Sequence, residues 1–241
     1  MGISAVRTIV RRRFRSLVRD HQRQTPSPKP VVGLFDQADA TIWYSRNQSI
    51  FGDAEPAEYF YKIKSGCVRT YKTLPDGRRQ IGSFYFPGDV FGLESGERHS
   101  LSAEAVTRCK LLVAERKLVI SRAAESNSIL RELLTLTNLE LRRTQSHIAL
   151  LLKTAQERVA SFLLEMEKFE HADGGIDLPM VRQDIADYLG LTIETVSRNL
   201  TRLESASAIL IPTNRRVVVC DRSMLKLLQE PASACLGPVV A

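Results

Sequence analysis

The chain has 241 residues, a formal net charge of +7 and a hydrophobic content of 44%. This length accommodates two domains with proper cores, and the composition is that of an ordinary globular protein. No apolar run reaches the roughly 20 residues that a bilayer-spanning helix needs. Arginines interrupt the apolar residues of the N-terminus, which therefore lacks the core of a secretory signal. We expect a cytoplasmic protein without a membrane partner.

The positive charge is concentrated at the N-terminus. Residues 1–30 contain eight arginines and lysines and one aspartate, which accounts for the whole net charge. The segment ends in a proline cluster that is typical of a linker. We expect a disordered basic tail over 1–30, with non-specific contact to DNA phosphates as the functional alternative. DNA binding therefore has to be argued from local patterns and not from net charge.

The residues that most often build metal or catalytic sites are dispersed. They are Cys67, Cys109, Cys220 and Cys235, together with His21, His99, His147 and His171. None is grouped at metal-ligand spacing, and no nucleophile is accompanied by a plausible base. We expect no metal, no cofactor and no enzymatic activity. Free thiols are the expected state of the cysteines, with redox-reactive thiols at Cys67 and Cys220 as the alternative.

Residues 31–125 have the pattern of a β domain. Short runs rich in β-branched and aromatic residues alternate with turn sequences, and Asp76-Gly77 is a strong hairpin signal. The strands are predicted at 40–44, 59–63, 67–71, 80–86 and 109–114. Strands at this spacing predict an all-β roll or barrel.

Residues 126–153 change to a helical period. Apolar or small residues recur every seven positions in two registers, at Leu134, Leu141, Ile148 and Ala155, and at Leu130, Thr137, Thr144 and Leu151. A seam of this length is difficult to bury on a small β domain. We therefore expect the helix to pair with a second copy of itself in a homodimer. Packing of the helix within its own domain is the alternative.

Residues 154–230 are predicted to form a DNA-binding domain of the helix-turn-helix type. A first short helix at Arg182–Leu189 ends at Gly190, because glycine enters the left-handed cap conformation without steric cost. A second helix begins at Thr192, whose hydroxyl suits an N-cap. Two short helices joined through glycine are typical of this motif, in which the second helix lies in the major groove. A helix at 154–169 and a short strand at 176–179 precede the motif.

The second helix presents side chains that suit base reading. Arg198 can donate two hydrogen bonds to guanine O6 and N7, Glu194 can accept from cytosine N4, and Ser197 can bond either way. Glu194 and Arg198 are four residues apart, so a surface ion pair is an alternative explanation for these two. That alternative does not explain the helix–glycine–helix layout.

A β-hairpin is predicted after the second helix, at 209–220 with its turn at Thr213-Asn214. Together with the two helices it makes a winged helix-turn-helix. The residues expected to contact the DNA backbone are Arg182, Gln183, Thr192, Thr195, Arg215 and Arg216. Val181 precedes the first helix and has no hydroxyl for an N-cap.

The sequence resembles the CRP/FNR superfamily of bacterial transcription factors, and within it the FixK-like branch. The resemblance covers nearly all of 35–228 and rests on Gly66-Cys-Val-Arg, on Pro87-Gly-Asp-Val-Phe-Gly, on the long helix, and most specifically on residues 182–198. It implies an α+β chain with an N-terminal β-roll of the cyclic-nucleotide-binding, jelly-roll type. It also implies a long dimerisation helix and a C-terminal winged helix-turn-helix.

The resemblance also implies a function. It predicts a homodimeric regulator, and an activator rather than a repressor, that binds double-stranded DNA at a TTGA…TCAA palindrome. Glu194, Ser197 and Arg198 fall on the base-reading positions of the family. The FixK-like branch implies control of nitrogen fixation or of a microoxic response.

The chain departs from its relatives where they take up signals. It has no cysteine before Cys67, so the N-terminal iron–sulfur cluster of oxygen-sensing members is not expected. Residues 92–101 keep only Glu94, Arg98 and Ser100 of the phosphate cassette, with His99 inserted between the last two. We therefore expect regulation without a small effector, as the FixK-like branch implies. Control by a cyclic nucleotide or by thiol oxidation is the alternative.

Two further partners are expected. The resemblance places the predicted hairpin turn, with Pro75, Asp76, Gly77, Arg78 and Arg79, where relatives touch RNA polymerase; an ordinary solvated turn is the alternative. The small apolar residues at 231–241 have no packing pattern and are expected to be disordered. Recognition of this tail by a protease would suit a regulator that is controlled by its abundance.

Overall fold

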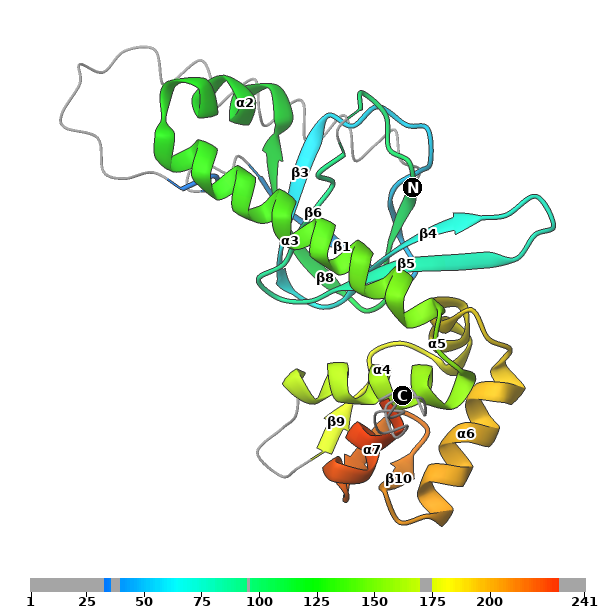
Figure 1. Ribbon diagram of the computed structural model, residues 1–241. Helices are drawn as coiled ribbons and strands as arrows, with labels where there is room; N and C mark the ends of the chain where they lie inside the picture. The colour runs from blue at the N-terminus through cyan, green and yellow to red at the C-terminus, as the bar shows by residue number, and fades with distance from the viewer. Residues whose placement is uncertain (1–32, 36–39, 95, 170–174, 230–241) are drawn as a thin grey trace, which may run out of the picture. The chain divides into compact units, whose positions relative to one another are not determined.

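The computed structural model describes residues 33–35, 40–94, 96–169 and 175–229 (Figure 1). These residues form two compact units. The first comprises the described residues through 78 together with 82–144, and the second comprises 79–81 and 145–229. The predicted tails at 1–30 and 231–241 lie outside the described residues. No described helix is long and apolar enough to cross a membrane.

Two four-stranded sheets make up the β domain of the first unit. One sheet has the order β1 (Ala40–Tyr44), β8 (Cys109–Glu115), β3 (Tyr59–Ser65), β6 (Val90–Phe91). The other has the order β2 (Ser49–Phe51), β7 (Ser102–Ala105), β4 (Val68–Thr73), β5 (Arg79–Tyr85). Strands that are distant in the sequence pair antiparallel, with Tyr44 opposite Cys109 and Tyr59 opposite Glu115. The predicted β-roll is confirmed.

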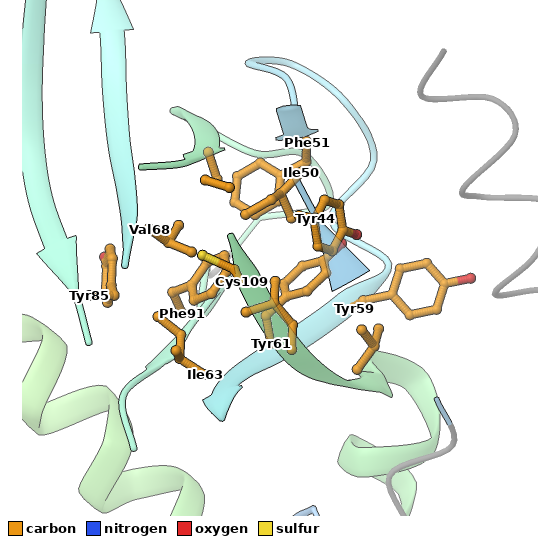
Figure 2. Packing of buried hydrophobic residues seen from close by; sticks show 14 residues of the cluster. Tyr44, Ile50, Phe51, Tyr59, Tyr61, Ile63, Val68, Tyr85, Phe91 and Cys109 are labelled. Atoms are coloured by element: carbon orange, nitrogen blue, oxygen red, sulfur yellow. The ribbon is translucent and has the colours of Figure 1, made fainter. Parts of the chain in front are cut away.

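The core of the roll forms because alternate residues of the strands point to the same side. Val68, Ile63, Leu111 and Phe91 are almost completely buried there. Four aromatic rings pack against one another with centroids 5.1–6.1 Å apart: Phe51, Tyr61, Phe91 and Tyr85. Figure 2 shows them in one cluster with Tyr44 and Cys109. This spacing is typical of favourable aromatic pairs. The interior of the roll is therefore filled by its own side chains.

Two helices follow the roll. The short helix α2 (Arg116–Glu125) was not predicted; it buries Val119 in a second apolar cluster with Leu34, Phe60 and Val90. The long helix α3 (Asn127–Leu151) confirms the helical period of 126–153. The predicted seam is too long by one position, because α3 ends at Leu151 and Ala155 begins the next helix instead.

The second unit contains the end of α3 and a small α+β domain. Its elements are α4 (Ala155–Met166), η2 (Glu167–Phe169), β9 (Gly175–Asp177), α5 (Arg182–Leu189), α6 (Ile193–Ser205), β10 (Ile209–Thr213), β11 (Arg216–Val219) and α7 (Arg222–Gln229). The three strands pair in the order β10, β11, β9. A full capping box starts α4, in which the Thr154 hydroxyl and the Glu157 carboxylate each accept a backbone N–H. The winged arrangement that the sequence predicts is confirmed.

Five of the eight strands of the roll were predicted, with ends that agree to within two residues. The missed strands β2, β6 and β7 have two to four residues each. Such short strands cannot show a period-2 pattern in the sequence. They exist because longer neighbours supply their hydrogen bonds.

Gly66 provides a test of the roll. Its φ is +90°, and a Cβ at this position would lie 2.5 Å from the Arg108 carbonyl oxygen. We expect Gly66→Ala to lower the free energy of unfolding by more than the roughly 1–3 kcal/mol of a strained backbone alone, because the collision with the backbone adds to it. Urea unfolding at fixed protein concentration measures the loss.

The matched control is Gly77→Ala. Gly77 also has a positive φ of +83°, but a Cβ there would meet no atom within 4 Å. This variant therefore carries the backbone strain without the collision. Equal losses in the two variants would contradict the close packing of Gly66 against Arg108.

Candidate nucleic-acid interface

The helix-turn-helix begins with α5, and its turn depends on one glycine. Ile185, Ala186 and Leu189 are buried on the inner face of α5. Gly190 ends the helix with φ 61° and ψ 39°, and its N–H binds the Ala186 carbonyl. The Leu191 N–H binds the same carbonyl at 3.0 Å. The left-handed residue turns the chain toward α6, as predicted from the sequence.

Thr192 caps α6 with its side chain. The hydroxyl oxygen accepts the Thr195 N–H at 3.2 Å, which confirms the predicted cap. The two threonine hydroxyls are 3.1 Å apart. Hydrogen bonds from its own N–H and from the Thr192 side chain lower the pKa of Glu194, and the Arg198 charge adds a smaller effect. The start of α6 is therefore fixed by polar groups of the motif itself.

One face of α6 is buried and the other is open. Val196, Leu200 and Leu203 are 0–3% exposed. Asn199 is also buried, and its side-chain amide donates to the Thr195 carbonyl at 2.8 Å. The sequence analysis missed Asn199, although its spacing from Val196 and Leu203 puts it near the inner face. The side chains of Glu194, Ser197, Arg198 and Thr201 are exposed on the other side.

The predicted alternative of a Glu194–Arg198 ion pair does not occur within the described part of the chain. No carboxylate of a described residue lies within ion-pair distance of the Arg198 guanidinium. All its N–H donors are therefore available at the exposed face of α6. A guanidinium without a partner can donate two parallel hydrogen bonds to a base edge or to a phosphate.

A groove of about 700 Å³ separates α6 from the wing. It is lined by residues of the start of α5, of the exposed side of α6 and of the β10–β11 hairpin: Val181, Arg182, Gln183, Ile193, Ser197, Leu200, Thr201, Glu204, Ile211, Asn214 and Arg215. Three elements that are separate in the sequence thus meet at one concave surface. Three of the residues predicted to contact the DNA backbone, together with Ser197, line it.

Arg215 and Arg216 point to different surroundings. Arg215 is exposed in the wing turn and lines the groove. The Arg216 guanidinium binds Asp177 at 3.1 Å on the neighbouring strand β9 and packs against Gly175, where a Cβ would collide with it. Its charge is engaged in holding the wing sheet together. This geometry does not support the predicted contact of Arg216 with DNA phosphate.

Arg182 lies inside the groove. Its Nη1 atom is buried without a hydrogen-bond partner among the described residues. Burial lowers the pKa of Arg182, and the Glu204 carboxylate partly opposes this effect. Glu204 also accepts the Ile211 N–H at 3.0 Å, which ties the end of α6 to the wing. As predicted, Val181 supplies no side-chain cap; instead the buried Asp184 carboxylate accepts the Val181 N–H at 3.4 Å.

The remaining predicted backbone contacts are placed on the edges of the motif. Gln183 is exposed, and its amide donates to Asp187 at 2.7 Å. Thr195 is half-buried beside Thr192. In the wing turn, the Thr213 hydroxyl accepts the N–H groups of Arg215 and Arg216 at 3.3 and 3.1 Å. These bonds fix the backbone of the wing tip, where the turn was predicted at Thr213-Asn214 without this role of the Thr213 hydroxyl.

Arg158 joins the end of α3 to the corner of the helix-turn-helix. Its guanidinium donates to the carbonyl oxygens of Leu151 at 2.6 Å, Lys153 at 2.8 Å and Leu189 at 2.8 Å, with a longer bond to Gly190 at 3.5 Å. These are carbonyls that helix ends leave without partners. The sequence analysis missed Arg158, because a single arginine on a helix carries no signal of such distant partners.

His147 packs beside this junction. Its ring stacks on Tyr188 with centroids 4.3 Å apart, and its Nε2 lies 2.8 Å from the Tyr188 carbonyl oxygen. A carbonyl only accepts, so Nε2 donates. Burial lowers the pKa of His147, while the hydrogen bond to Tyr188 and the Glu165 charge raise it less. The imidazole is therefore held neutral at physiological pH.

The predicted dimer seam is exposed along α3. Leu130, Leu134, Leu141 and Ile148 are 41–57% exposed. Thr137 and Thr144 are also exposed, and each hydroxyl donates to the carbonyl one turn earlier. Leu151 is half-buried. A row of large apolar side chains that is open to solvent over several turns is unusual for a monomer and is typical of an interaction face.

The predicted polymerase contact is an exposed turn. Pro75, Asp76, Gly77 and Arg78 are exposed, and Asp76 binds Arg78 at 2.7 Å. The hydrogen bonds from the Arg78 side chain and backbone lower the pKa of Asp76, and the Arg78 charge adds a smaller effect. Arg79 is half-buried, and its guanidinium binds the carboxylates of Asp184 and Asp187, which belong to the same unit as Arg79. The first four residues are therefore accessible, whereas Arg79 is occupied.

The two predicted redox cysteines differ in access. Cys67 is 2% exposed in the core of the roll, whereas Cys220 is exposed after the last wing strand. Oxidants act on accessible thiolates, so burial argues against Cys67 as a redox site. No group of three or more His, Cys, Asp or Glu side chains that could hold a metal ion lies within the described ranges.

The remnant of the phosphate cassette is engaged with the roll itself. The His99 ring is buried and stacks on Phe51 at 3.5 Å, with its Nδ1 3.1 Å from a Glu94 oxygen. Arg98 donates to the Ala54 carbonyl at 2.7 Å. The inserted histidine thus fills part of the region with an aromatic side chain, and Arg98 is bound to backbone.

Together these features define a class of protein. A cyclic-nucleotide-binding-type roll, a long helix and a winged helix-turn-helix with an open recognition helix make a DNA-binding transcription regulator. Two family models match the two units: the cyclic nucleotide-binding domain over residues 41–125 and the Crp-like helix-turn-helix domain over 157–228.

Comparison with known proteins identifies the family within this class of regulators. The nitrogen fixation regulation protein FixK of Azorhizobium caulinodans is 48% identical over 193 residues, which is 78% of each chain. The protein of that name from Rhizobium meliloti is 38% identical over 77% of this chain and 85% of its own. The structure of FixK2 from Bradyrhizobium japonicum superimposes with a TM-score of 0.77 at 45% identity, over 80% of this chain and 98% of that one. The chain belongs to the CRP/FNR family of transcription regulators and to its FixK-like branch, and is not an enzyme.

Arg158 provides a test of the junction. We expect Arg158→Gln to lower the free energy of unfolding by about 2–3 kcal/mol, because hydrogen bonds from a charged donor contribute roughly 1.5–3 kcal/mol and the partly exposed carbonyls regain water. Thermal and urea unfolding at fixed protein concentration measure the change.

The control for this variant is Arg202→Gln. Arg202 is exposed on α6 and has no side-chain partner in the described part of the chain. Its replacement should change stability by less than about 0.5 kcal/mol. If both variants lose the same stability, Arg158 does not hold the junction.

Proposed function

We propose that the protein binds a two-fold-symmetric DNA site of the TTGA…TCAA kind as a homodimer, and that it does so without a small-molecule effector. The observation that carries the proposal is the open face of α6. Glu194, Ser197 and Arg198 are exposed there, and Arg198 has no described carboxylate partner. These side chains have the donors and acceptors that base edges in the major groove require.

Contacts to the DNA backbone are proposed around this face. Arg182 and Gln183 at the start of α5 and Arg215 in the wing line the groove. Thr192 and Thr195 lie at the start of α6. The free N–H groups at a helix start favour phosphate, and Arg215 adds an exposed positive charge. Arg216 is left out of this set because Asp177 already binds it.

The exposed seam of α3 is the proposed dimer interface. Pairing of two copies along α3 would cover Leu134, Leu141 and Ile148, which are 54–57% exposed in the single chain. A two-fold dimer places two recognition helices on half-sites about one helical turn apart. This requirement connects the apolar seam to a palindromic site.

Independence of an effector is proposed from the roll. A small molecule would need room inside it, and the side chains there pack in one buried cluster rich in aromatic rings, which supports the proposal. The loop at Asp89 and α3 are already connected: Tyr85 donates to Glu140 at 2.7 Å, and Arg143 binds both Asp89 at 2.9 Å and Glu140 at 3.1 Å. Burial raises the pKa of Tyr85, so its phenol stays protonated and remains a donor.

Other modes of control are less well supported. Thiol oxidation at Cys220 is the alternative, and the exposure of this cysteine after the last wing strand supports it. Cyclic-nucleotide control would have to use Arg98, whose guanidinium is bound to the Ala54 carbonyl.

The biological role is proposed from the relatives. Their names place them in the regulation of nitrogen fixation, and we propose the same class of target genes for this protein. Activation through RNA polymerase at the exposed turn of residues 75–78 follows the family resemblance. Recognition of the apolar tail at 231–241 by a protease remains a hypothesis on residues outside the described structure. A regulator of this kind acts where the DNA is, in the cytoplasm.

Two arginine variants separate base reading from backbone contact. Arg198→Ala should cost about 1–3 kcal/mol of binding free energy and relax the preference at one base position. Arg215→Ala should weaken binding to all sequences alike and reduce the salt dependence by about one phosphate contact. Titration of cognate and scrambled duplexes at several salt concentrations measures both. Equal losses on the two duplexes for Arg198→Ala would remove its assignment as a base-reading residue.

Two leucines of equal exposure test the dimer. Leu141 lies on the seam and Leu139 lies off it, and each is 54% exposed. We expect Leu141→Glu to raise the dimer dissociation constant at least about 100-fold, because each dimer loses two buried leucines worth about 1.5–3 kcal/mol each. Leu139→Glu should leave it unchanged. Sedimentation over a concentration series measures both, and a dimer that survives Leu141→Glu would contradict the interface.

A further inference from the structure

An exposed tryptophan lies on the outer face of the roll. Trp43 of β1 is 51% exposed and is the single tryptophan of the chain. Its strand neighbour on β8 is Lys110, and Lys110 Nζ lies 5.5 Å from the centre of the indole ring. The Arg108 guanidinium lies 4.5 Å from the same centre. Both distances are within the range of cation–π attraction.

The surroundings of this indole are positive. Lys64 is exposed on β3, next to Ser65, which is the strand neighbour of Lys110. We call Trp43, Lys64, Arg108 and Lys110 the Trp43 patch. None of its three cations forms an ion pair with another described residue. The patch therefore presents unbalanced positive charge around a large apolar surface.

The arrangement leaves hydrogen-bonding capacity directed outward. A guanidinium above an aromatic ring interacts with the ring through its flat face, so the N–H donors at its edge stay free for a carboxylate. The cation–π contacts also restrict the side chains before any partner arrives, which reduces the entropy lost on binding. Trp and Arg are enriched in protein–protein interfaces, and particularly among the residues that dominate their energy.

The chemistry of the patch selects between two kinds of partner. A nucleic-acid backbone would neutralise the cations but would bury little of the indole. A protein surface with clustered Asp or Glu side chains and neighbouring apolar atoms would satisfy both parts of the patch. We propose that the Trp43 patch docks an acidic protein surface, whose carboxylates bind Arg108 and Lys110 and whose apolar atoms cover Trp43. This interaction is separate from DNA binding by α6.

Because Trp43 is the single tryptophan of the chain, its fluorescence reports binding at the Trp43 patch. The full-length protein is titrated with a synthetic peptide of alternating Glu and Leu residues that contains no aromatic residue, and Trp43 fluorescence is followed. We expect a saturable change in emission that weakens as salt is added, because exposed charges are screened. A Lys-Leu peptide of the same length should leave the emission unchanged. No emission change with the Glu-Leu peptide would overturn the proposal.

Charge reversal localises the binding. Arg108→Glu should weaken the Glu-Leu peptide at least about tenfold. The matched control is Lys117→Glu, which makes the same change in charge on α2, where Lys117 is exposed and has no described partner. It should bind within about twofold of the wild type. Circular dichroism confirms that both variants fold. Equal affinities of the two variants for the peptide would contradict the assignment.

Duplex DNA without an operator sequence tests whether the Trp43 patch recognises phosphate or an acidic protein surface. We expect it to leave Trp43 emission unchanged and not to displace the peptide, since the DNA-reading helix is in the second unit. Displacement of the peptide by this DNA would show that the patch recognises phosphate and would overturn the acidic-protein assignment. Operator binding, followed by a label on the DNA, is measured in the same samples, so that failure of the patch is distinguished from failure of DNA recognition.

Discussion

The burial of one stripe of α6 is the interaction on which the functional surface depends. Val196, Leu200 and Leu203 pack against α4 and α5, and each fully buried aliphatic side chain is worth roughly 1.5–3 kcal/mol. This stripe fixes the rotation of the helix about its axis. Glu194, Ser197 and Arg198 are open because of that rotation and not because of any contact of their own. The exposure of the face that we propose to read bases is therefore a consequence of the core.

A second set of interactions fixes where α6 begins and where it ends. Gly190 turns the chain, Thr192 caps the helix, and Glu204 binds the wing through the Ile211 N–H. Arg158 then connects the turn to the last residues of α3. These contacts hold the helix-turn-helix against the last residues of α3 within one chain.

Much of this could be predicted from the sequence. Both helices of the motif, the glycine turn, the cap and the wing follow from local residue types, because their causes lie within a few residues. The seam of α3 is visible for the same reason. The contacts of Arg158, the ion pair of Arg216 with Asp177 and the burial of Asn199 could not be predicted in this way, since their partners are distant or depend on which face packs inward. Arg216 is an example. Its place in the predicted wing suggested a contact with DNA phosphate, whereas in the structure its guanidinium binds the Asp177 carboxylate.

In the roll, Phe51 packs against Phe91, Tyr61 stacks on Phe91, and His99 stacks on Phe51. We propose that a dimer reads its site without an added effector. Selection of bound DNA from a random pool, with purified protein and no nucleotide or reductant added, tests this proposal. We expect enrichment of a two-fold-symmetric sequence of the TTGA…TCAA kind. Enrichment that appears only when a cyclic nucleotide is added, or no enrichment at all, would contradict it.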